Sequence, residues 1–147
     1  PFRALQNHMA SECAFCKIVQ GELPAHKVFE DAQTLAFLDL NPITPGHVLV
    51  IPKEHHEWLL DLPIQIQGPL LETVQRVARA ILKATNAQGF NVGMNNGRVA
   101  GQIVFHAHFH IIPRYAGDRL THWPGHSGDE RSLKDLCEKI AAAMEKR

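Results

Sequence analysis

Residues 103–112 read Ile-Val-Phe-His-Ala-His-Phe-His-Ile-Ile, and Pro113 follows them. Side chains alternate between the two faces of a β-strand. The stretch therefore predicts a strand with one apolar face and a second face that carries His106, His108 and His110. Histidines two positions apart on such a strand are separated by roughly 6.5 to 7 Å. Because unpaired polar groups are costly to bury, three imidazoles in a row on an otherwise apolar strand indicate a functional site.

Two kinds of chemistry suit this row of imidazoles. A neutral imidazole nitrogen is a competent nucleophile near neutral pH, and its neighbours can donate hydrogen bonds to phosphate oxygens. Gln102, Asn95 and the backbone of the 97–101 loop would add neutral donors to such a site. Alternatively, all three histidines are metal ligands, since imidazole nitrogen binds zinc well.

The rest of the chain predicts a mixture of strands and helices in one domain. Periodic apolar residues predict a long helix over about 67–86 and a last helix over about 131–145, where Cys137 lies on the apolar face and is expected in the core. A short helix is expected over 12–20, and strands over 26–30, 34–39, 47–51 and 89–95. The order lacks regular βαβ alternation, so we predict an α+β fold: a five-stranded antiparallel sheet with one long central helix and a C-terminal helix.

Composition narrows the function classes. The chain has 147 residues, with 15 acidic and 15 basic side chains. A balanced charge offers no basic field for a nucleic acid, and no apolar run is long enough to cross a membrane. Three cysteines favour a reducing compartment, so we expect a cytoplasmic protein. We interpret residues 1–8 as a vector-derived tail and residues 9–147 as the single domain.

Several motifs in this order resemble the histidine-triad (HIT) superfamily. They are His-x-His-x-His at 106–110, Cys16 to Ala25, Phe37-Leu38-Asp39, Pro45 to Lys53, Asn95-Asn96-Gly97 and Gly101-Gln102. His110 followed by two isoleucines is similar to the hydrolase branches, and His122-Trp123-Pro124 resembles the Hint-like branch. The resemblance covers most of residues 12–124, and the C-terminal helix is similar to that of many bacterial members.

The resemblance implies a mechanism and a set of residues. His108 would attack the α-phosphorus of a purine nucleoside phosphoramidate, mixed anhydride or dinucleoside polyphosphate, and water would then release the nucleoside monophosphate. His110, Gln102 and His47 would assist. The nucleotide-binding residues implied are Phe15, Ile18 and Phe37 around the base, Asp39 and Leu40 at the ribose, and Asn95, Gly101, Gln102, His108 and His110. Packing in an ordinary core explains the three apolar residues equally well. Ile103 stands where the Hint-like branch commonly has serine, so a hydroxyl contact to the leaving group is absent.

Cys13 and Cys16 have the spacing of half a tetrahedral zinc site. In some bacterial relatives this pair binds structural zinc with two histidines, and the matching positions are His55 and His106. His56 is an alternative to His55, and a redox-active cysteine pair is an alternative to a metal site. If His106 binds zinc, its role is structural rather than catalytic.

The leading hypothesis is a nucleotidyl hydrolase that needs no metal for catalysis. A nucleotide-binding regulatory protein with little turnover is the first alternative, and a protein that binds metal through all three histidines is the second. The resemblance also implies a homodimer, with the 67–86 helix and the sheet edge near 89–95 at its interface.

Overall fold

The computed structural model describes residues 12–146. The tail predicted over residues 1–8 lies outside this range. None of the helices in the described part combines the length and apolar character needed to cross a membrane.

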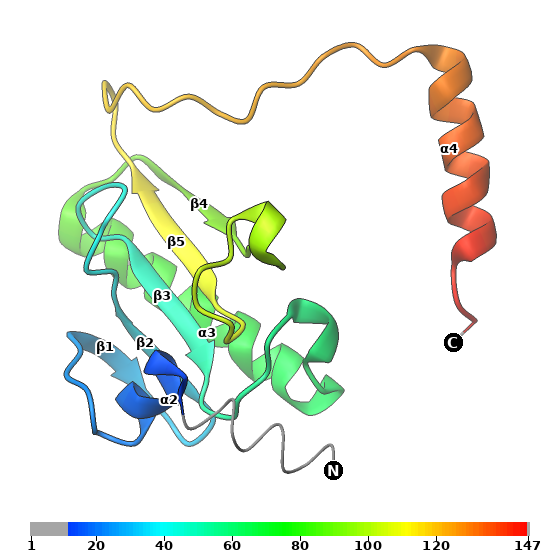
Figure 1. Ribbon diagram of the computed structural model, residues 1–147. Helices are drawn as coiled ribbons and strands as arrows, with labels where there is room; N and C mark the ends of the chain where they lie inside the picture. The colour runs from blue at the N-terminus through cyan, green and yellow to red at the C-terminus, as the bar shows by residue number, and fades with distance from the viewer. Residues whose placement is uncertain (1–11, 147) are drawn as a thin grey trace.

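The elements follow one another in the predicted order. They are α2 (Ala14–Val19), β1 (Lys27–Glu30), β2 (Thr34–Leu38), β3 (Val48–Pro52), the 3₁₀ turn η1 (Leu59–Asp61), α3 (Ile64–Thr85), β4 (Gly89–Gly93), the 3₁₀ turn η2 (Arg98–Ala100), β5 (Phe109–Arg114) and α4 (Glu130–Ala143). The strands form one antiparallel sheet in the order β1-β2-β3-β5-β4. The predicted fold class, with its long helix and C-terminal helix, is confirmed (Figure 1).

The sheet carries one layer of apolar packing on each face. On one face α3 packs its buried stripe, which comprises Ile66, Leu70, Val74, Val77, Ala78 and Ile81, against the sheet. On the other face α2 packs Phe15 and Ile18 over the apolar side chains of β2 and β3. His110 pairs in register with Leu49, which belongs to this second layer. The histidine row therefore faces the α2 side, and we call this side the triad face.

The helix α3 begins at Ile64, three residues before the predicted start. Its C-terminal end is set by Asn86, whose backbone is left-handed at φ 56° and whose N–H donates to the Leu82 carbonyl. A left-handed residue cannot continue an α-helix, and asparagine tolerates that conformation better than most residues do.

The strand predicted over 103–112 is shorter than expected, because β5 begins only at Phe109. Its pairing with β3 stops at Val50, two residues before Pro52. Proline has no N–H to donate, and the Pro52 carbonyl accepts a hydrogen bond from the His106 ring instead of from a strand. Residues 103–108 thus leave the ladder, and Ile103 is 89% exposed instead of lying on an apolar strand face.

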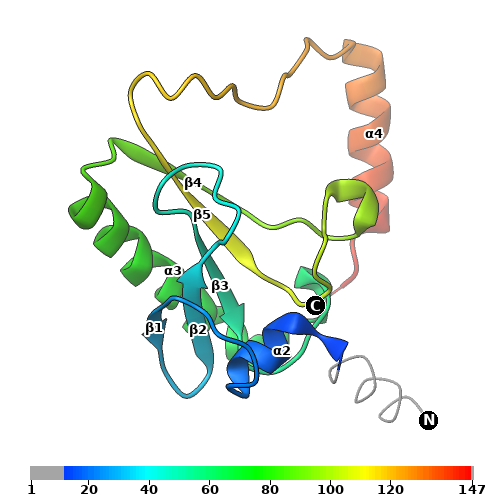
Figure 2. The same cartoon turned by 60° about the vertical axis from the view of Figure 1, so that its left-hand side comes forward.

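The helix α4 stands apart from the body of the molecule, at the end of the extended segment 115–129 (Figures 1 and 2). All of its residues are exposed. The expectation that Cys137 lies in the core is therefore wrong, because this cysteine is exposed. Nothing in the described part of this chain covers the apolar side of α4.

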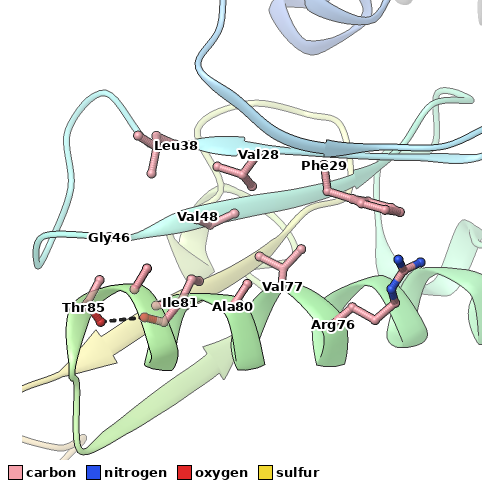
Figure 3. A pocket seen from close by; sticks show the side chains of 11 residues that line it. Val28, Phe29, Leu38, Gly46, Val48, Arg76, Val77, Ala80, Ile81 and Thr85 are labelled. Atoms are coloured by element: carbon pink, nitrogen blue, oxygen red, sulfur yellow. Dashed lines mark hydrogen bonds between the residues drawn. The ribbon is translucent and has the colours of Figure 1, made fainter.

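A hollow of about 430 Å³ lies on the α3 face, between that helix and the β1–β2 hairpin (Figure 3). Its lining is mainly aliphatic, and Val28, Leu38, Val48 and Ile81 are among the residues that form it. The Arg76 guanidinium lies 4.7 Å from the centre of the Phe29 ring, a cation–π distance. We call this hollow the α3 groove; it is on the side of the sheet opposite the histidine row.

Candidate functional site

His108 holds its ring in one orientation through the backbone of its own segment. Its Nδ1 lies 2.7 Å from the carbonyl oxygen of His106. A carbonyl can only accept, so Nδ1 must carry the proton and donate. In the neutral ring, Nε2 then carries the lone pair. The Phe15 ring packs edge-on against the His108 ring at 5.1 Å between centroids and limits its movement. This arrangement presents Nε2 as a nucleophile.

A backbone carbonyl also orients the His106 ring, but here the protonated nitrogen is Nε2 instead of Nδ1. Its Nε2 lies 2.7 Å from the Pro52 carbonyl and therefore donates to it. Its Nδ1 lone pair points at two thiols, with 3.5 Å to Sγ of Cys13 and 3.5 Å to Sγ of Cys16. His106 is 0% exposed, so no substrate can reach it in this structure. It is thus separated from His108 in environment as well as in orientation.

His47 and His110 form a directed pair. The backbone N–H of Ile43 donates to Nδ1 of His47 at 3.1 Å, so the proton of the neutral ring is on Nε2. That Nε2 lies 2.9 Å from Nδ1 of His110, which must accept. The proton of neutral His110 is consequently on its own Nε2. One backbone amide thereby makes His110 a hydrogen-bond donor on its outer side.

Burial keeps these rings uncharged at neutral pH. Burial lowers the pKa of His108, although the His106 carbonyl and the Asp39 carboxylate oppose the shift. Burial, together with the neighbouring His108 and His47, lowers the pKa of His110 to about 4. The pKa of His47 is lowered as well, again mainly by burial. Neutral rings are what the hydrogen-bond directions above require.

Two of the implied nucleotide-binding residues lie close to His108: the Phe15 ring packs against it, and the Asp39 carboxylate is near enough to affect its pKa. Phe15 and Phe37 pack edge-to-face at 5.3 Å between centroids, and both are buried. Ile18 is buried beside them in the same cluster. The Asp39 carboxylate accepts the Asn41 N–H through Oδ1 at 2.8 Å, while Oδ2 lies 3.6 Å from Nε2 of His47. Leu40, next along the chain, is 75% exposed.

The side chain of Gln102 is hydrogen-bonded to the backbone of the loops around it. Its Oε1 accepts the Gly97 N–H at 2.8 Å, and its Nε2 donates to the carbonyls of Glu57 and Val104 at 2.8 and 3.2 Å. Gln102 therefore ties the loop around η2 to the segment before η1. Asn95 donates weakly to the Gly101 carbonyl at 3.4 Å.

A second cluster lies behind His106. The side chains of Cys13, Cys16, His55 and His106 place one ligand atom each within 4.8 Å of one another. His55 contributes Nδ1, which lies 3.3 Å from Sγ of Cys16, so the geometry selects His55 rather than His56. Burial and the adjacent Cys13 raise the pKa of the Cys16 thiol to about 12.

The chemistry of this donor set suits a zinc ion. Two thiols and two imidazoles form a common tetrahedral ligand set for Zn²⁺. His106 already offers its lone pair, and its outer N–H is held by the Pro52 carbonyl, as is typical of metal-bound histidine. Burial disfavours the thiolate form of Cys16 and so raises its pKa, and a bound cation would supply the charge that favours this thiolate.

Asp39, His47 and His110 also each place one possible ligand atom within 4.8 Å of the others. A cation bound to Nε2 of neutral His47 would require the proton on Nδ1, where the Ile43 N–H already donates. This trio is therefore better suited to hydrogen bonding than to metal binding.

Main-chain groups set the orientation of the rings, and the sequence pattern does not identify which groups these are. The Ile43 amide, the Pro52 carbonyl and the His106 carbonyl each fix one imidazole. Every residue type except proline supplies an amide, so a sequence offers no signal for such a role. Trp58 was also not anticipated: it packs beside Gly97, where an added Cβ would lie 3.1 Å from its ring.

A family model described as the HIT domain matches residues 20–117. Among curated proteins, the chain is 43% identical over 126 residues to adenylylsulfatase HINT3 of Arabidopsis thaliana, covering 86% of this chain and 63% of that protein, which is less than two thirds of its length. It is 38% identical over 144 residues to adenosine 5′-monophosphoramidase HNT1 of Candida albicans, covering 92% and 93% of the two chains.

Solved structures agree with the fold. SMU.412c from Streptococcus mutans superposes with a TM-score of 0.85 at 44% identity, covering 91% of this chain and 86% of that one. A zinc-bound histidine-triad family protein from Mycobacterium smegmatis superposes with a TM-score of 0.72 at 37% identity, covering 92% and 99%.

Proposed function

This chain belongs to the HIT domain family, and from that membership we propose that it is a nucleotidyl hydrolase whose nucleophile is Nε2 of His108. The observation that carries the proposal is the hydrogen bond from Nδ1 of His108 to the His106 carbonyl at 2.7 Å. It leaves the Nε2 lone pair available, and it also supports the positive charge that the ring gains when Nε2 forms a bond. Burial keeps His108 neutral and hence nucleophilic at physiological pH.

The reaction proceeds in two displacements at the α-phosphorus. In the first, Nε2 of His108 forms a bond to phosphorus while the bond to the leaving nitrogen or oxygen breaks. In the second, water attacks phosphorus, the bond to Nε2 breaks and the nucleoside monophosphate is released. Nε2 of His110 would donate to a phosphate oxygen or to the departing atom, because His47 holds the proton on that side. Preorganised donors of this kind are worth about 10² to 10³ in rate.

The proposed substrates are purine nucleoside phosphoramidates or dinucleoside polyphosphates. Asp39, whose carboxylate is part-exposed next to His47, would accept hydrogen bonds from the ribose hydroxyls. Phe15, Ile18 and Phe37 would form the apolar slot for the base, with Leu40 at its edge. The Candida relative, named an adenosine 5′-monophosphoramidase, supports the phosphoramidate option.

We further propose that Cys13, Cys16, His55 and His106 hold a structural zinc ion. When bound, zinc supplies a positive charge that stabilises the two thiolates and crosslinks α2 to the histidine segment. The role of these residues would be to fix the His106 carbonyl on which His108 depends. The zinc-bound Mycobacterium relative supports the assignment.

We also propose a homodimer that pairs through the edge strand β4 and the neighbouring α3. β4 is the terminal strand of the sheet, so one side of it has no strand partner among the described residues. Exposed apolar residues, Phe90 and Val92, lie on this strand. Unpaired edges that carry apolar side chains are typical of strand-to-strand interfaces.

The test is intact-mass and peptide mass spectrometry after rapid quenching with adenosine 5′-phosphoramidate or diadenosine tetraphosphate. We expect an adenylyl adduct on His108 and release of AMP. His108→Ala should abolish both, whereas His126→Ala, which removes an exposed histidine far along the C-terminal segment, should change neither. Tight nucleotide binding without adduct or product would instead support the regulatory alternative and refute the hydrolase.

A further inference from the structure

The loop between β2 and β3, residues 39–47, carries the amide that sets the proton positions of the His47 and His110 pair. The Ile43 N–H donates to Nδ1 of His47 at 3.1 Å, and Nε2 of His47 then donates to His110 at 2.9 Å. The Ile43 side chain is 56% exposed, so its own packing does not fix the amide. Other contacts must therefore hold this part of the loop in place.

A buried threonine joins the β2–β3 loop to the strand that carries His110. Thr44 is 5% exposed, and its hydroxyl donates to the Pro113 carbonyl of β5 at 2.6 Å. The pairing of β3 with β5 runs only as far as Val48 and Ile111, so Pro113 lies beyond it. The Thr44 hydroxyl therefore continues the connection between the two segments past the end of the ladder.

A tyrosine just after β5 forms a second connection to the same loop. The Tyr115 hydroxyl donates to the Pro45 carbonyl at 2.6 Å. The backbone of Tyr115 is itself held, because its N–H donates to the Asp118 carboxylate at 3.1 Å. The next loop residue also approaches β5 closely, since a Cβ at Gly46 would lie 3.2 Å from a side-chain carbon of Pro113. Three consecutive loop residues are thus held against the end of β5.

We propose that Thr44 and Tyr115 are positioning residues, which hold the Ile43 amide against His47 and so keep the proton of His110 on Nε2. The inference rests on the hydrolase proposed above, in which that N–H donates to the substrate. Thr44 follows Ile43 directly, so a shift of its backbone moves the Ile43 amide. The bond from this amide to His47 is 3.1 Å long, and a small displacement takes it out of the usual range of hydrogen-bond distances.

The test compares Thr44→Val with Thr44→Ser in the full-length protein. Valine keeps the shape of threonine and removes the donor to Pro113, whereas serine retains a hydroxyl donor. Thr73→Val is the matched control, because it removes another buried threonine hydroxyl, which lies 2.8 Å from the Thr34 hydroxyl on the α3 side of the sheet. Imidazole nitrogen NMR reports the tautomers without any substrate, and hydrolysis of adenosine 5′-phosphoramidate reports kcat.

In Thr44→Val we expect the His110 proton to be shared between the two ring nitrogens, and kcat to fall by about 10- to 100-fold, as when a positioned group is displaced. Thr44→Ser should keep the proton on Nε2 and retain most of the activity. Thr73→Val should lower the free energy of unfolding and change neither the tautomer nor kcat. A loss of stability in Thr44→Val with the His110 tautomer unchanged would assign Thr44 a merely structural role and overturn the proposal.

A second variant, Tyr115→Phe, removes a hydrogen bond at the surface and leaves the core intact. It should shift the His110 tautomer in the same direction as Thr44→Val and to a smaller extent. An unchanged tautomer in Tyr115→Phe would overturn the proposal even if Thr44→Val did not fold. The His108 adduct would be measured in the unmodified protein. Its absence together with the expected tautomer shifts would remove the hydrolase alone, whereas an adduct without those shifts would remove only the positioning role.

Discussion

The hydrogen bond between His47 and His110 is the most discriminating feature of the site to perturb. His47 is 2% exposed and receives the Ile43 N–H at Nδ1, which directs its own proton to His110 at 2.9 Å. We compare His47→Leu with His47→Gln. Both lose the bond from Ile43 at the Nδ1 position, but only glutamine retains a donor near the position of Nε2.

The expected loss follows from the proton position on His110. Without a donor at its Nδ1, His110 is free to place its proton there, and its outer nitrogen would then repel a phosphate oxygen. Loss of one preorganised donor costs about 10² to 10³ in kcat, so we expect a fall of about 10² or more in His47→Leu and a smaller fall in His47→Gln. Leaving the Ile43 amide unpaired costs about 1 to 3 kcal/mol of folding stability in both variants.

Steady-state hydrolysis of adenosine 5′-phosphoramidate measures the first effect, and thermal unfolding measures the second. Imidazole nitrogen NMR reports the His110 tautomer directly and should show the proton on Nε2 in the unmodified protein. Equal activity of the leucine and glutamine variants, or a proton on Nδ1 of His110 in the unmodified protein, would refute the reasoning.

The remaining predictions concern pH, the metal and the core. The depressed pKa values of His108 and His110, about 4 for the latter, mean that kcat/KM should persist as the pH falls below the ordinary histidine pKa of about 6.5; a sharp loss at that pH would contradict neutral buried rings. The free energy of unfolding is expected to decrease at low pH. A histidine with a depressed pKa stabilises the fold fully above pH 6.5, and this contribution disappears as the pH falls towards 4. Urea titrations at several pH values would show the decrease. His55→Ala should abolish stoichiometric zinc in native mass spectra, whereas His56→Ala should retain it, and the reverse pattern would assign the ligand to His56. Thr34→Val should destabilise the protein by about 1 to 3 kcal/mol, because it leaves the buried Thr73 hydroxyl without its 2.8 Å partner; a change within error in chemical unfolding would count against that bond.

The fold was largely predictable because its elements have strong periodic patterns. The stripe of α3 and the apolar run of β3 each identify their element and its buried side. The start of β5 was not predictable from alternation, since the limit of its pairing depends on Pro52 of a strand far away in sequence. The separation of α4 from the body of the molecule was not predictable either, because an amphipathic pattern marks the apolar side of a helix but does not say what covers that side.

The residue types of the candidate site were predictable, but the different roles of its three histidines were less so. Alternation alone treats the three histidines as equivalent. The structure separates them through contacts with distant residues: His106 faces Cys13 and Cys16, His110 faces His47, and His108 turns back on its own backbone. Gln102, expected as a phosphate donor, is engaged by three backbone groups of the surrounding loops.

The backbone control of the rings also bears on how this protein can change during evolution. The groups that orient the imidazoles are the Ile43 amide and the carbonyls of Pro52 and His106, so they are backbone groups and not side chains. Most other amino acids can therefore replace Ile43 without changing the position of the proton on the His47 ring. Proline is the exception, because it removes the amide. A histidine site that is oriented by backbone groups tolerates sequence divergence around it. A single proline at position 43 would nevertheless remove the hydrogen bond to His47 and impair the site, although every histidine is still present.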